Sequence, residues 1–324
     1  MLRRDSVTFP ARTPMSPAAD TPWRPEREIE IVAGTAPGGG LDRTARALAA
    51  ALAESGLAGV PARVVNVPGD GARKAWTVVA ARPGDPHLVS ISSPNLATDR
   101  IVGLASFDHA DFTPLAILYT EYIGFVVRAG SRFATGADLA AALARGGVTV
   151  ALSTALGNPN HIALAQVIRA AGGDPRSPQI RVFDSALDAV ADVVAGNADV
   201  GAVTAASAVR ELAAGTLRAV AVSAPARLAG LYAQTPTWRE QSVDCVMGAW
   251  RGVTGPRGLA PAHVAGWERL LEAAIRTAAW QAELERHYWT PLYVAGATLA
   301  DQLAREQREF AQTLAALGLA APRT

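Results

Sequence analysis

The sequence predicts an α/β protein of two lobes, each built on a mainly parallel sheet flanked by helices. Short β-branched or apolar runs alternate with longer runs rich in alanine and leucine along the 324 residues, and this alternation is typical of βα units. The number of units suits two sheets better than one. Two apolar segments, 119–127 and 219–228, are the candidates for crossings between the lobes. We therefore expect a flexible tail over 1–27, a first lobe over 28–122 and 224–324, and a second lobe over 123–223.

The first lobe is expected to begin with a strand over 28–34 and a helix over 41–55. In that helix Leu41, Ala45, Leu48 and Leu52 fall on one face of a 3.6-residue period. The expected elements that follow are strands over 62–69 and 87–93 and a helix over 71–82. A fourth strand, over 122–128, leads into the second lobe.

In the second lobe, apolar runs and alanine-rich runs alternate four times. The expected strands are 148–154, 180–185, 198–204 and 217–224, and the expected helices are 135–145, 160–172, 186–196 and 207–215. The last third of the chain is mostly helical, with long runs over 261–284 and 298–318. No internal repeat of fixed period is present.

Composition excludes several classes of protein. Half of the residues are hydrophobic, 18% are charged and the net charge is +1, without a basic stripe, so no nucleic-acid partner is expected. No stretch of about 18 apolar residues exists, so stable membrane insertion is not expected. Cys245 is the only cysteine, which excludes an internal disulfide and a cysteine-built metal site. The N-terminus lacks the 7–15-residue apolar core of a signal peptide, which argues against export.

A glycine turn lies between the first strand and the first helix, in the stretch "APGGGLDR". It lacks the lysine of a phosphate-binding Walker loop, and Arg43 stands where the dinucleotide fingerprint G-x-G-x-x-G needs its last glycine. Two interpretations stay open. The turn can expose backbone N–H groups to a ligand carboxylate or phosphate at the start of a helix. Alternatively it is a tight turn whose helix is capped by Asp42. The candidate ligand residues here are Pro37, Gly38, Gly39, Gly40 and Asp42.

Two further loops carry neutral polar groups at strand ends. One supplies Ser92, Ser93 and Asn95, and the other supplies Ser153, Thr154, Gly157, Asn158 and Asn160. Taken singly, each is more simply a polar loop that caps the helix after it. Three such loops at the carboxyl ends of strands favour one shared cleft, in which hydroxyl, amide and backbone N–H groups orient a ligand.

Catalytic and metal-binding motifs are scarce. The chain has no G-x-S-x-G nucleophile elbow and no H-E-x-x-H metal spacing, so neither a metal nor a cofactor is expected. His161 begins a helix close to Ser153 in sequence and is a candidate base for that hydroxyl. A histidine in such a place is more often a structural hydrogen-bonding group. A small-molecule hydrolase that uses Ser153 and His161 is therefore an alternative, and turnover lost in Ser153→Ala would identify it.

Six stretches, taken in order, resemble a known family, the substrate-binding receptors of tripartite tricarboxylate transporters, or Bug proteins. They are "APGGGLDRTARALAAAL", "HADFTPLAILY", "ALSTALGNPNHIALAQ", "DVVAGNADVG", "AAGTLRAVAVSAPARLAGLYAQTPTWREQ" and "AWRGVTGPRGLAP". Each stretch alone is a weak signal, whereas six in the right order over about 26–320 are fairly specific.

The resemblance implies a type II periplasmic-binding-protein fold that closes on a small ligand, without catalysis. It further implies a ligand with a carboxylate or a related group, delivery to a membrane permease, a periplasmic location and a monomer. By resemblance, Pro37 to Asp42 lie on the ligand loop of the first lobe, and Ser153, Thr154, Gly157 and His161 on that of the second. A ligand sensor for a signalling partner is the alternative role within this class.

The chain departs from the family pattern in the second lobe. Ala155 stands where the family usually has glycine, and Asn158 where it usually has serine. Phe183, Asp184 and Ser185 stand where Tyr-Lys-Gly is common. If Asp184 faces the cleft, it repels each ligand carboxylate by roughly 3–4 kcal/mol at an effective dielectric constant near 20. The ligand would then be no citrate-like polyacid, but a monocarboxylate with an amine, or a neutral or cationic aromatic. If Asp184 points to solvent, this restriction disappears.

Overall fold

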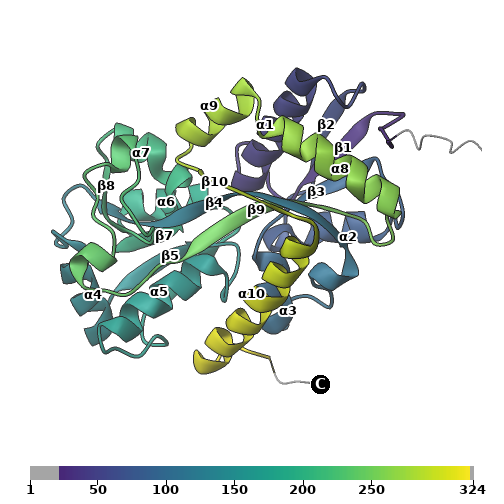
Figure 1. Ribbon diagram of the computed structural model, residues 1–324. Helices are drawn as coiled ribbons and strands as arrows, with labels where there is room; N and C mark the ends of the chain where they lie inside the picture. The colour runs from purple at the N-terminus through teal and green to yellow at the C-terminus, as the bar shows by residue number, and fades with distance from the viewer. Residues whose placement is uncertain (1–21, 322–324) are drawn as a thin grey trace, which may run out of the picture.

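One strand of 16 residues, β4 (Thr113–Arg128), runs through both lobes of the protein (Figure 1). Its first half pairs with β9 (Gly248–Gly255) and β10 (Thr290–Ala295), and its second half pairs with β7 (Val200–Thr204) and β8 (Leu217–Val222). This architecture comes from a computed structural model that describes residues 22–321, so most of the expected tail over 1–27 lies outside the described residues. A single strand shared by two sheets makes β4 the natural hinge between the lobes.

The sheet of the first lobe has the order β2-β1-β3-β9-β4, with β10 also on β4. Its remaining strands are β1 (Ile29–Ala33), β2 (Ala62–Asn66) and β3 (Leu88–Ser92). β1 runs parallel to β2 and β3, whereas β9 runs antiparallel to β3 and β4. The carboxyl ends of β1 and β3 therefore lie at the same edge, where their loops meet.

Helices cover both faces of this sheet (Figure 1). They are α1 (Gly40–Ser55), α2 (Arg73–Ala80), α3 (Asn95–Ile101), α8 (Pro261–Ala274), α9 (Ala278–Arg286) and the short 3₁₀ turns η1 (Asp70–Ala72) and η2 (His109–Asp111). α1 packs against α8 and α9, and the core around them holds the fully buried Trp76, Trp267 and Trp280. Together with the buried Trp289, these indoles give this lobe a large buried apolar area.

The second lobe continues the sheet in the order β4-β7-β5-β6, with β8 on β4. Its elements are β5 (Thr149–Ser153), β6 (Gln179–Phe183), α4 (Gly136–Arg145), α5 (Pro159–Ala170), α6 (Ala186–Ala195), α7 (Val209–Ala213) and the 3₁₀ turns η3 (Ala205–Ala208), η4 (Gly230–Tyr232) and η5 (Arg239–Gln241). β5 runs parallel to β6 and β7. The loops after β5, β6 and β7 therefore share the edge that faces the first lobe.

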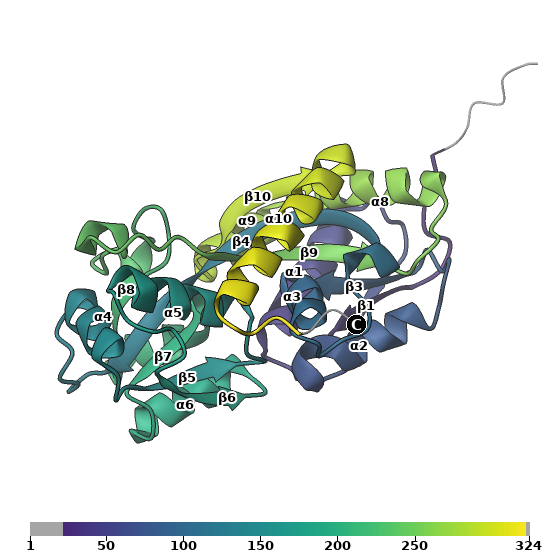
Figure 2. The same ribbon diagram turned by 90° about the horizontal axis from the view of Figure 1, so that it is seen from below.

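The C-terminal helix α10 (Gly296–Ala316) packs against both lobes. Phe310 and Leu314 on α10 belong to one buried cluster with Ala97 of α3 and Ile162 of α5. Seen from below, α10 lies over α3 and extends toward α5 (Figure 2). This cluster joins the lobes on the side of the molecule where α3 and α5 approach one another.

Most of the expected elements form, and the differences have clear causes. The sheet of the first lobe is mixed because β9 and β10 run antiparallel to β4. The sequence does not predict β9 or β10. In addition, β4 begins at Thr113, earlier in the chain than the expected strand 122–128. β9 contains three glycines that dilute its apolar pattern. The expected helix 261–284 is two helices, because Thr277 caps a new one through its hydroxyl.

The lobe boundaries stay a prediction. Trp238, Val243 and Cys245 pack in the core of the second lobe, although the expected return to the first lobe lies at residue 224. We therefore propose that the chain returns to the first lobe along β9.

Candidate functional site

A cavity of about 580 Å³ lies between the two lobes, at the loops that follow β1, β2, β3, β5, β6 and β7. We call its first-lobe side the first wall, formed by lining residues of 34–43 and 68–72 with Ser93, Asn95 and Arg251. The opposite side is the second wall, formed by Ser153, Thr154, 158–160, 184–188, Thr204 and Ser207; Ala249 of β9 also lines the cavity. Its position at the carboxyl ends of parallel strands is the usual place for a ligand in α/β sheets.

The glycine turn of the first wall is held in shape by Asp42. This side chain is 2% exposed, and it accepts hydrogen bonds from the Gly38 backbone N–H at 2.8 Å and from Asn66 Nδ2 at 2.8 Å. Gly38 has φ +85°, a conformation that favours glycine. Burial would raise the pKa of Asp42, but the hydrogen bonds from Arg46, Gly38 and Asn66 outweigh it and hold that pKa below its ordinary value. Asp42 itself does not line the cavity, so it positions the turn from behind.

Two arginines give the first wall a positive charge. A Cβ on Gly40, the first residue of α1, would lie 3.9 Å from Arg43 Nη2 and 3.9 Å from Arg251 Nη2. Both guanidinium groups therefore flank the start of a 16-residue helix, where unpaired N–H groups and the helix dipole also favour an anion. Arg43 Nη1 donates to the Gly38 carbonyl at 2.8 Å, and its buried Nε has no hydrogen-bond partner among the described residues.

Arg251 is anchored by the hinge strands. Its Nη2 lies 2.5 Å from Glu121 Oε1, and Glu121 on β4 is 1% exposed. Nη1 donates to the carbonyl groups of Ala249 and Trp250. Within the described part of the chain, Arg251 Nε and Glu121 Oε2 are buried without a partner. One of the two arginine charges is thus balanced by Glu121, which leaves the first wall with a net positive charge.

Neutral polar groups dominate the loop after β5 on the second wall. Asn158 Nδ2 donates to the Ser153 carbonyl at 2.6 Å and to Thr154 Oγ1 at 2.7 Å, while Asn158 caps α5 through the His161 N–H. Asn160 Nδ2 donates to Ser153 Oγ at 3.2 Å. Thr154 has φ +70°, a strained conformation for a β-branched residue. Such strain persists because the surrounding hydrogen bonds determine the backbone.

The two walls touch directly at several points. Asn95 Nδ2 of the first wall donates to Thr154 Oγ1 of the second at 3.0 Å. Arg43 Nη2 lies 3.5 Å from Ser207 Oγ, and a Cβ on Gly71 would lie 3.4 Å from the Thr154 carbonyl oxygen. These contacts require the lobes to be close together, so the structure represents a closed arrangement.

Ser153 and His161 do not form a nucleophile–base pair. Ser153 Oγ accepts from Asn160, whereas His161 Nδ1 accepts from the Gly157 N–H at 2.9 Å. Burial lowers the pKa of His161 to about 4, so the ring is neutral at pH 7 and its role here is structural. The geometry therefore gives no support to the hydrolase alternative.

The loop after β6 gives the second wall a negative charge. Asp184, Ser185 and Asp188 all line the cavity, and both carboxylates are exposed. Ser185 caps α6 by accepting the Asp188 N–H at 3.1 Å, and its hydroxyl lies 2.6 Å from Asp188 Oδ2. Asp184 therefore lies among the residues that line the cavity, with an exposed side chain.

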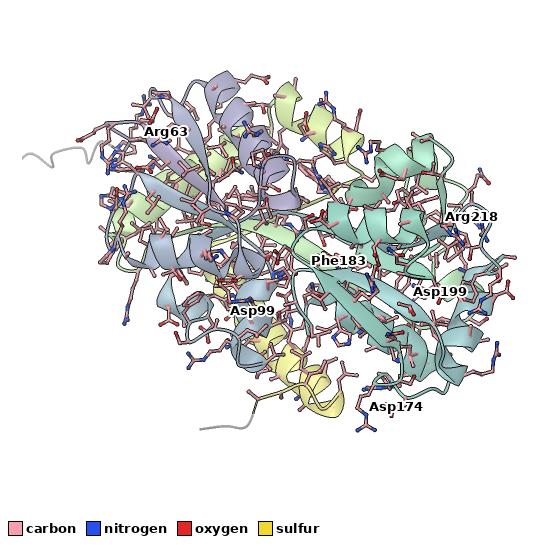
Figure 3. All side chains as sticks on the ribbon, turned by 180° about the vertical axis from the view of Figure 1, so that it is seen from behind. Arg63, Asp99, Asp174, Phe183, Asp199 and Arg218 are labelled. Atoms are coloured by element: carbon pink, nitrogen blue, oxygen red, sulfur yellow. The ribbon has the colours of Figure 1, made fainter. Side chains whose placement is uncertain are left out.

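The expected site residues divide into two groups. On the cavity wall are Pro37, Gly39, Gly40, Ser93, Asn95, Ser153, Thr154, Asn158, Asp184 and Ser185. Behind the wall are Gly38, Asp42, Ser92, Ala155, Gly157, His161 and Phe183. A Cβ on Gly157 would lie 2.7 Å from Val102 of the first lobe, so Gly157 serves the contact between lobes. Phe183 packs in a hydrophobic cluster beneath α6 and lies at the end of β6 where the lobes meet (Figure 3).

Sequence reading missed several lining residues. Arg43 and Arg251 line the cavity although the motifs that contain them predict no contact with a ligand, and the loop 68–72, Thr204 and Ser207 carry no motif. The segment "PGDG" at 68–71 signals a turn at the end of a strand and could have identified that loop. Thr204 ends the strand β7, so the rule used for the other loops applies to it as well. Nothing in the sequence shows that β9 brings Arg251 beside Gly40.

The described residues contain no group of three or more His, Cys, Asp or Glu side chains placed to hold a metal ion. None of the helices in this part of the chain has the length and apolarity needed to cross a membrane.

Comparison with known proteins gives the chain its family. No protein-family profile matches it. The "UPF0065 protein in tcbD-tcbE intergenic region" of Pseudomonas sp. (strain P51) is 30% identical over 239 residues, which cover 72% of this chain and 69% of that protein. In addition, a TctC solute-binding protein from Polaromonas superposes with a TM-score of 0.67 at 25% identity, over 90% of this chain and 99% of that one.

Two structures from Rhodopseudomonas palustris share the fold at lower identity. Rpa4515 with adipate has a TM-score of 0.81 at 23% identity, over 91% of this chain and 99% of that one. MatC with bound malate has a TM-score of 0.78 at 22% identity, over 90% and 99%. The α/β fold with two lobes is thus that of periplasmic binding proteins, and the chain belongs to the UPF0065 (Bug) family of solute-binding receptors of tripartite tricarboxylate transporters.

Proposed function

We propose that this protein binds a small organic ligand with a carboxylate group in the cavity between its lobes and delivers it to a membrane permease. The observation that carries the proposal is the construction of the cavity from both lobes, with the walls joined by the Asn95–Thr154 hydrogen bond. A ligand that contacts both walls stabilises the closed arrangement more than an open one, and this difference in affinity drives closure.

The first wall is suited to a carboxylate. Arg43, Arg251 and the N-terminus of α1 direct positive charge and N–H donors at the same region of the cavity. Related structures contain malate and adipate, both carboxylates, in the same fold. A volume of about 580 Å³ is within the range of sites for small organic molecules.

The proposal includes a membrane permease as partner and a periplasmic location, because both are typical of the family. Receptors of this class hand their ligand to a membrane component. In this role the cavity needs neither a metal nor a catalytic group.

The test is a thermal-shift screen of the purified protein against mono- and dicarboxylates, amino acids and pyridine carboxylates, followed by calorimetric titration of the hits. A ligand at 100 times its Kd adds about 2.7 kcal/mol to the free energy of unfolding. We expect at least one carboxylate to raise Tm. If no compound of the panel raises Tm and none binds in calorimetry, the proposal is contradicted.

A matched pair of variants links binding to the cavity. Arg43→Ala removes a cation of the first wall and is expected to weaken carboxylate binding about tenfold or more. Arg63→Ala removes a cation at the outer edge of the same lobe, paired with Glu28 (Figure 3), and is expected to leave binding unchanged. An equal loss of affinity in both variants would show that the ligand does not bind beside Arg43.

A further inference from the structure

We propose that the ligand is an aminocarboxylate, which binds with its carboxylate at the first wall and its protonated amine at the loop 184–188 of the second wall. This inference rests on the proposed function and specifies the chemistry of the ligand. It follows from the opposite charges that the two lobes present to one cavity.

The positive side is formed by two arginines, of which Arg43 has no carboxylate partner among the described residues and Arg251 is paired with Glu121. Arg43 contacts only a backbone carbonyl group and, at 3.5 Å, the hydroxyl of Ser207. Arg251 keeps a hydrogen bond to Glu121, but its guanidinium still lines the cavity beside Gly40. A ligand carboxylate that reaches these groups also meets the start of α1.

The negative side is formed by two carboxylates that lack a cation. The nearest arginine along β6, Arg181, is held by Asp192 through Nε at 2.7 Å and Nη2 at 3.0 Å. Among the described residues, neither Asp184 nor Asp188 forms an ion pair, and Asp188 accepts only the hydroxyl of Ser185. Two unpaired acids at the wall of a closed cleft are arranged to receive a positively charged group.

The same acids disfavour an anion at the start of α6. That helix has 10 residues and its N-terminus would otherwise attract a carboxylate. Asp188 in the first turn and Asp184 directly before the cap oppose the positive end of this helix. Unlike Asp42 in the first turn of α1, which pairs with Arg46, neither has a cation partner among the described residues. A dicarboxylate that spans the cavity would place its second charge against these two groups.

The experiment uses three series of ligands matched in chain length, each with members of four, five and six carbon atoms, measured by calorimetry on the full-length protein. The probes are 4-aminobutyrate, 5-aminopentanoate and 6-aminohexanoate, the dicarboxylates succinate, glutarate and adipate, and the monocarboxylates butyrate, pentanoate and hexanoate. We expect the best aminocarboxylate to bind about tenfold or more tightly than the dicarboxylate or monocarboxylate of similar length.

Charge variants test the assigned contact. In Asp184→Asn the affinity for the aminocarboxylate should fall about 5–10-fold, while that for the dicarboxylate rises by a similar factor. Asp174→Asn removes an equivalent charge at the outer end of the second lobe (Figure 3), where Asp174 pairs with Arg176. It should change neither affinity. The Tm of each ligand-free variant shows whether it is folded.

Each outcome decides between the two proposals. Tighter binding of dicarboxylates, with no response to Asp184→Asn, would overturn the aminocarboxylate and leave the carboxylate receptor standing. The same holds if none of the three series binds but another acid of the screen does. If no compound in either experiment binds, both proposals fall.

Discussion

The two walls of the cavity carry charge in different ways. The first wall uses cations that are part of the fold: Arg251 is tied to a buried glutamate on the hinge strand, and the glycine turn beside Arg43 is held by the buried Asp42. The second wall uses Asp184 and Asp188, which are exposed and have no cation partner among the described residues. This difference indicates that the first wall is fixed before a ligand arrives, whereas the acids of the second wall are free to interact with it.

The largest expected effect on the free energy of unfolding comes from removal of Arg251, the cation of the first wall that pairs with Glu121. Arg251→Ala leaves Glu121, which is 1% exposed, without its partner. Removal of one member of a buried ion pair typically costs about 3–5 kcal/mol. We expect a loss of this size in urea unfolding, whereas Asp184→Asn should change the free energy of unfolding by less than about 0.5 kcal/mol.

The double variant Arg251→Met/Glu121→Gln serves as the control, because it removes both charges. Its stability should recover most of the loss, while carboxylate binding should not recover. A loss below about 1 kcal/mol in Arg251→Ala would mean that the pair is solvated and that the walls do not differ as described.

The second effect concerns the support behind the glycine turn. Asp42→Ala removes acceptors for the Gly38 N–H and for Asn66, and buried donors left unsatisfied cost about 1–3 kcal/mol each. We expect a stability loss of about 2–4 kcal/mol and weaker ligand binding, measured by urea unfolding and calorimetry. Lost stability with unchanged affinity would show that the turn does not shape the site.

The third effect is a dependence of stability on pH that arises from His161, behind the second wall. Burial lowers the pKa of His161 from 6.5 to about 4, so the folded state binds fewer protons than the unfolded state between these values. The contribution of the neutral His161 to the free energy of unfolding is therefore fully present above pH 6.5 and is lost as the pH falls from 6.5 toward 4. At pH 5 the loss is about 2 kcal/mol relative to pH 7.

His161→Gln separates this contribution from others. Burial raises the pKa of Asp99 to about 6 and that of Glu306 to about 7. The contribution of each of these two groups to the free energy of unfolding falls as the pH rises, which is opposite to the effect of His161. The difference between the wild type and the variant should shrink as the pH falls from 7 to 5. A constant difference over that range would contradict a neutral, buried His161.

The smallest expected effect comes from removal of the hydrogen bond between the two walls. Asn95→Ala removes the hydrogen bond from Asn95 to Thr154 across the cavity, which is worth about 0.5–1.5 kcal/mol. We expect a larger radius of gyration without ligand in small-angle scattering and an affinity reduced several-fold. An unchanged radius would show that other contacts, such as the α10 cluster, hold the lobes together.

Much of this architecture could be predicted from the chain alone. The apolar runs that became β1, β5 and β7 are strong signals, because parallel strands buried on both faces need continuous apolar residues. Polar residues at the ends of β3, β5 and β6, among them Ser93, Ser153 and Asp184, could be assigned to loops at the cavity because each follows or ends a strand that the sequence predicts. Whether Asp184 faces the cavity could not be decided, since that depends on how the lobes are oriented.

The missed features depend on contacts between distant parts of the chain. Arg251 and Glu121 are 130 positions apart and meet only because β9 and β4 pair in antiparallel register. β9 itself was hidden by its glycines, which are required by close packing: a Cβ on Gly252 would lie 2.6 Å from the Ala116 carbonyl oxygen. The sequence also suggested Asp42 and His161 as ligand contacts, although polar residues near a site often support it from behind.

The most direct test is a crystal structure of the protein with the tightest-binding aminocarboxylate of the matched series. We predict that the carboxylate lies beside Arg43 and Arg251 at the start of α1, and that the amine lies within hydrogen-bonding distance of Asp184 or Asp188. Electron density for the ligand outside the cavity, or in the reverse orientation with its carboxylate at the loop 184–188, would contradict the account.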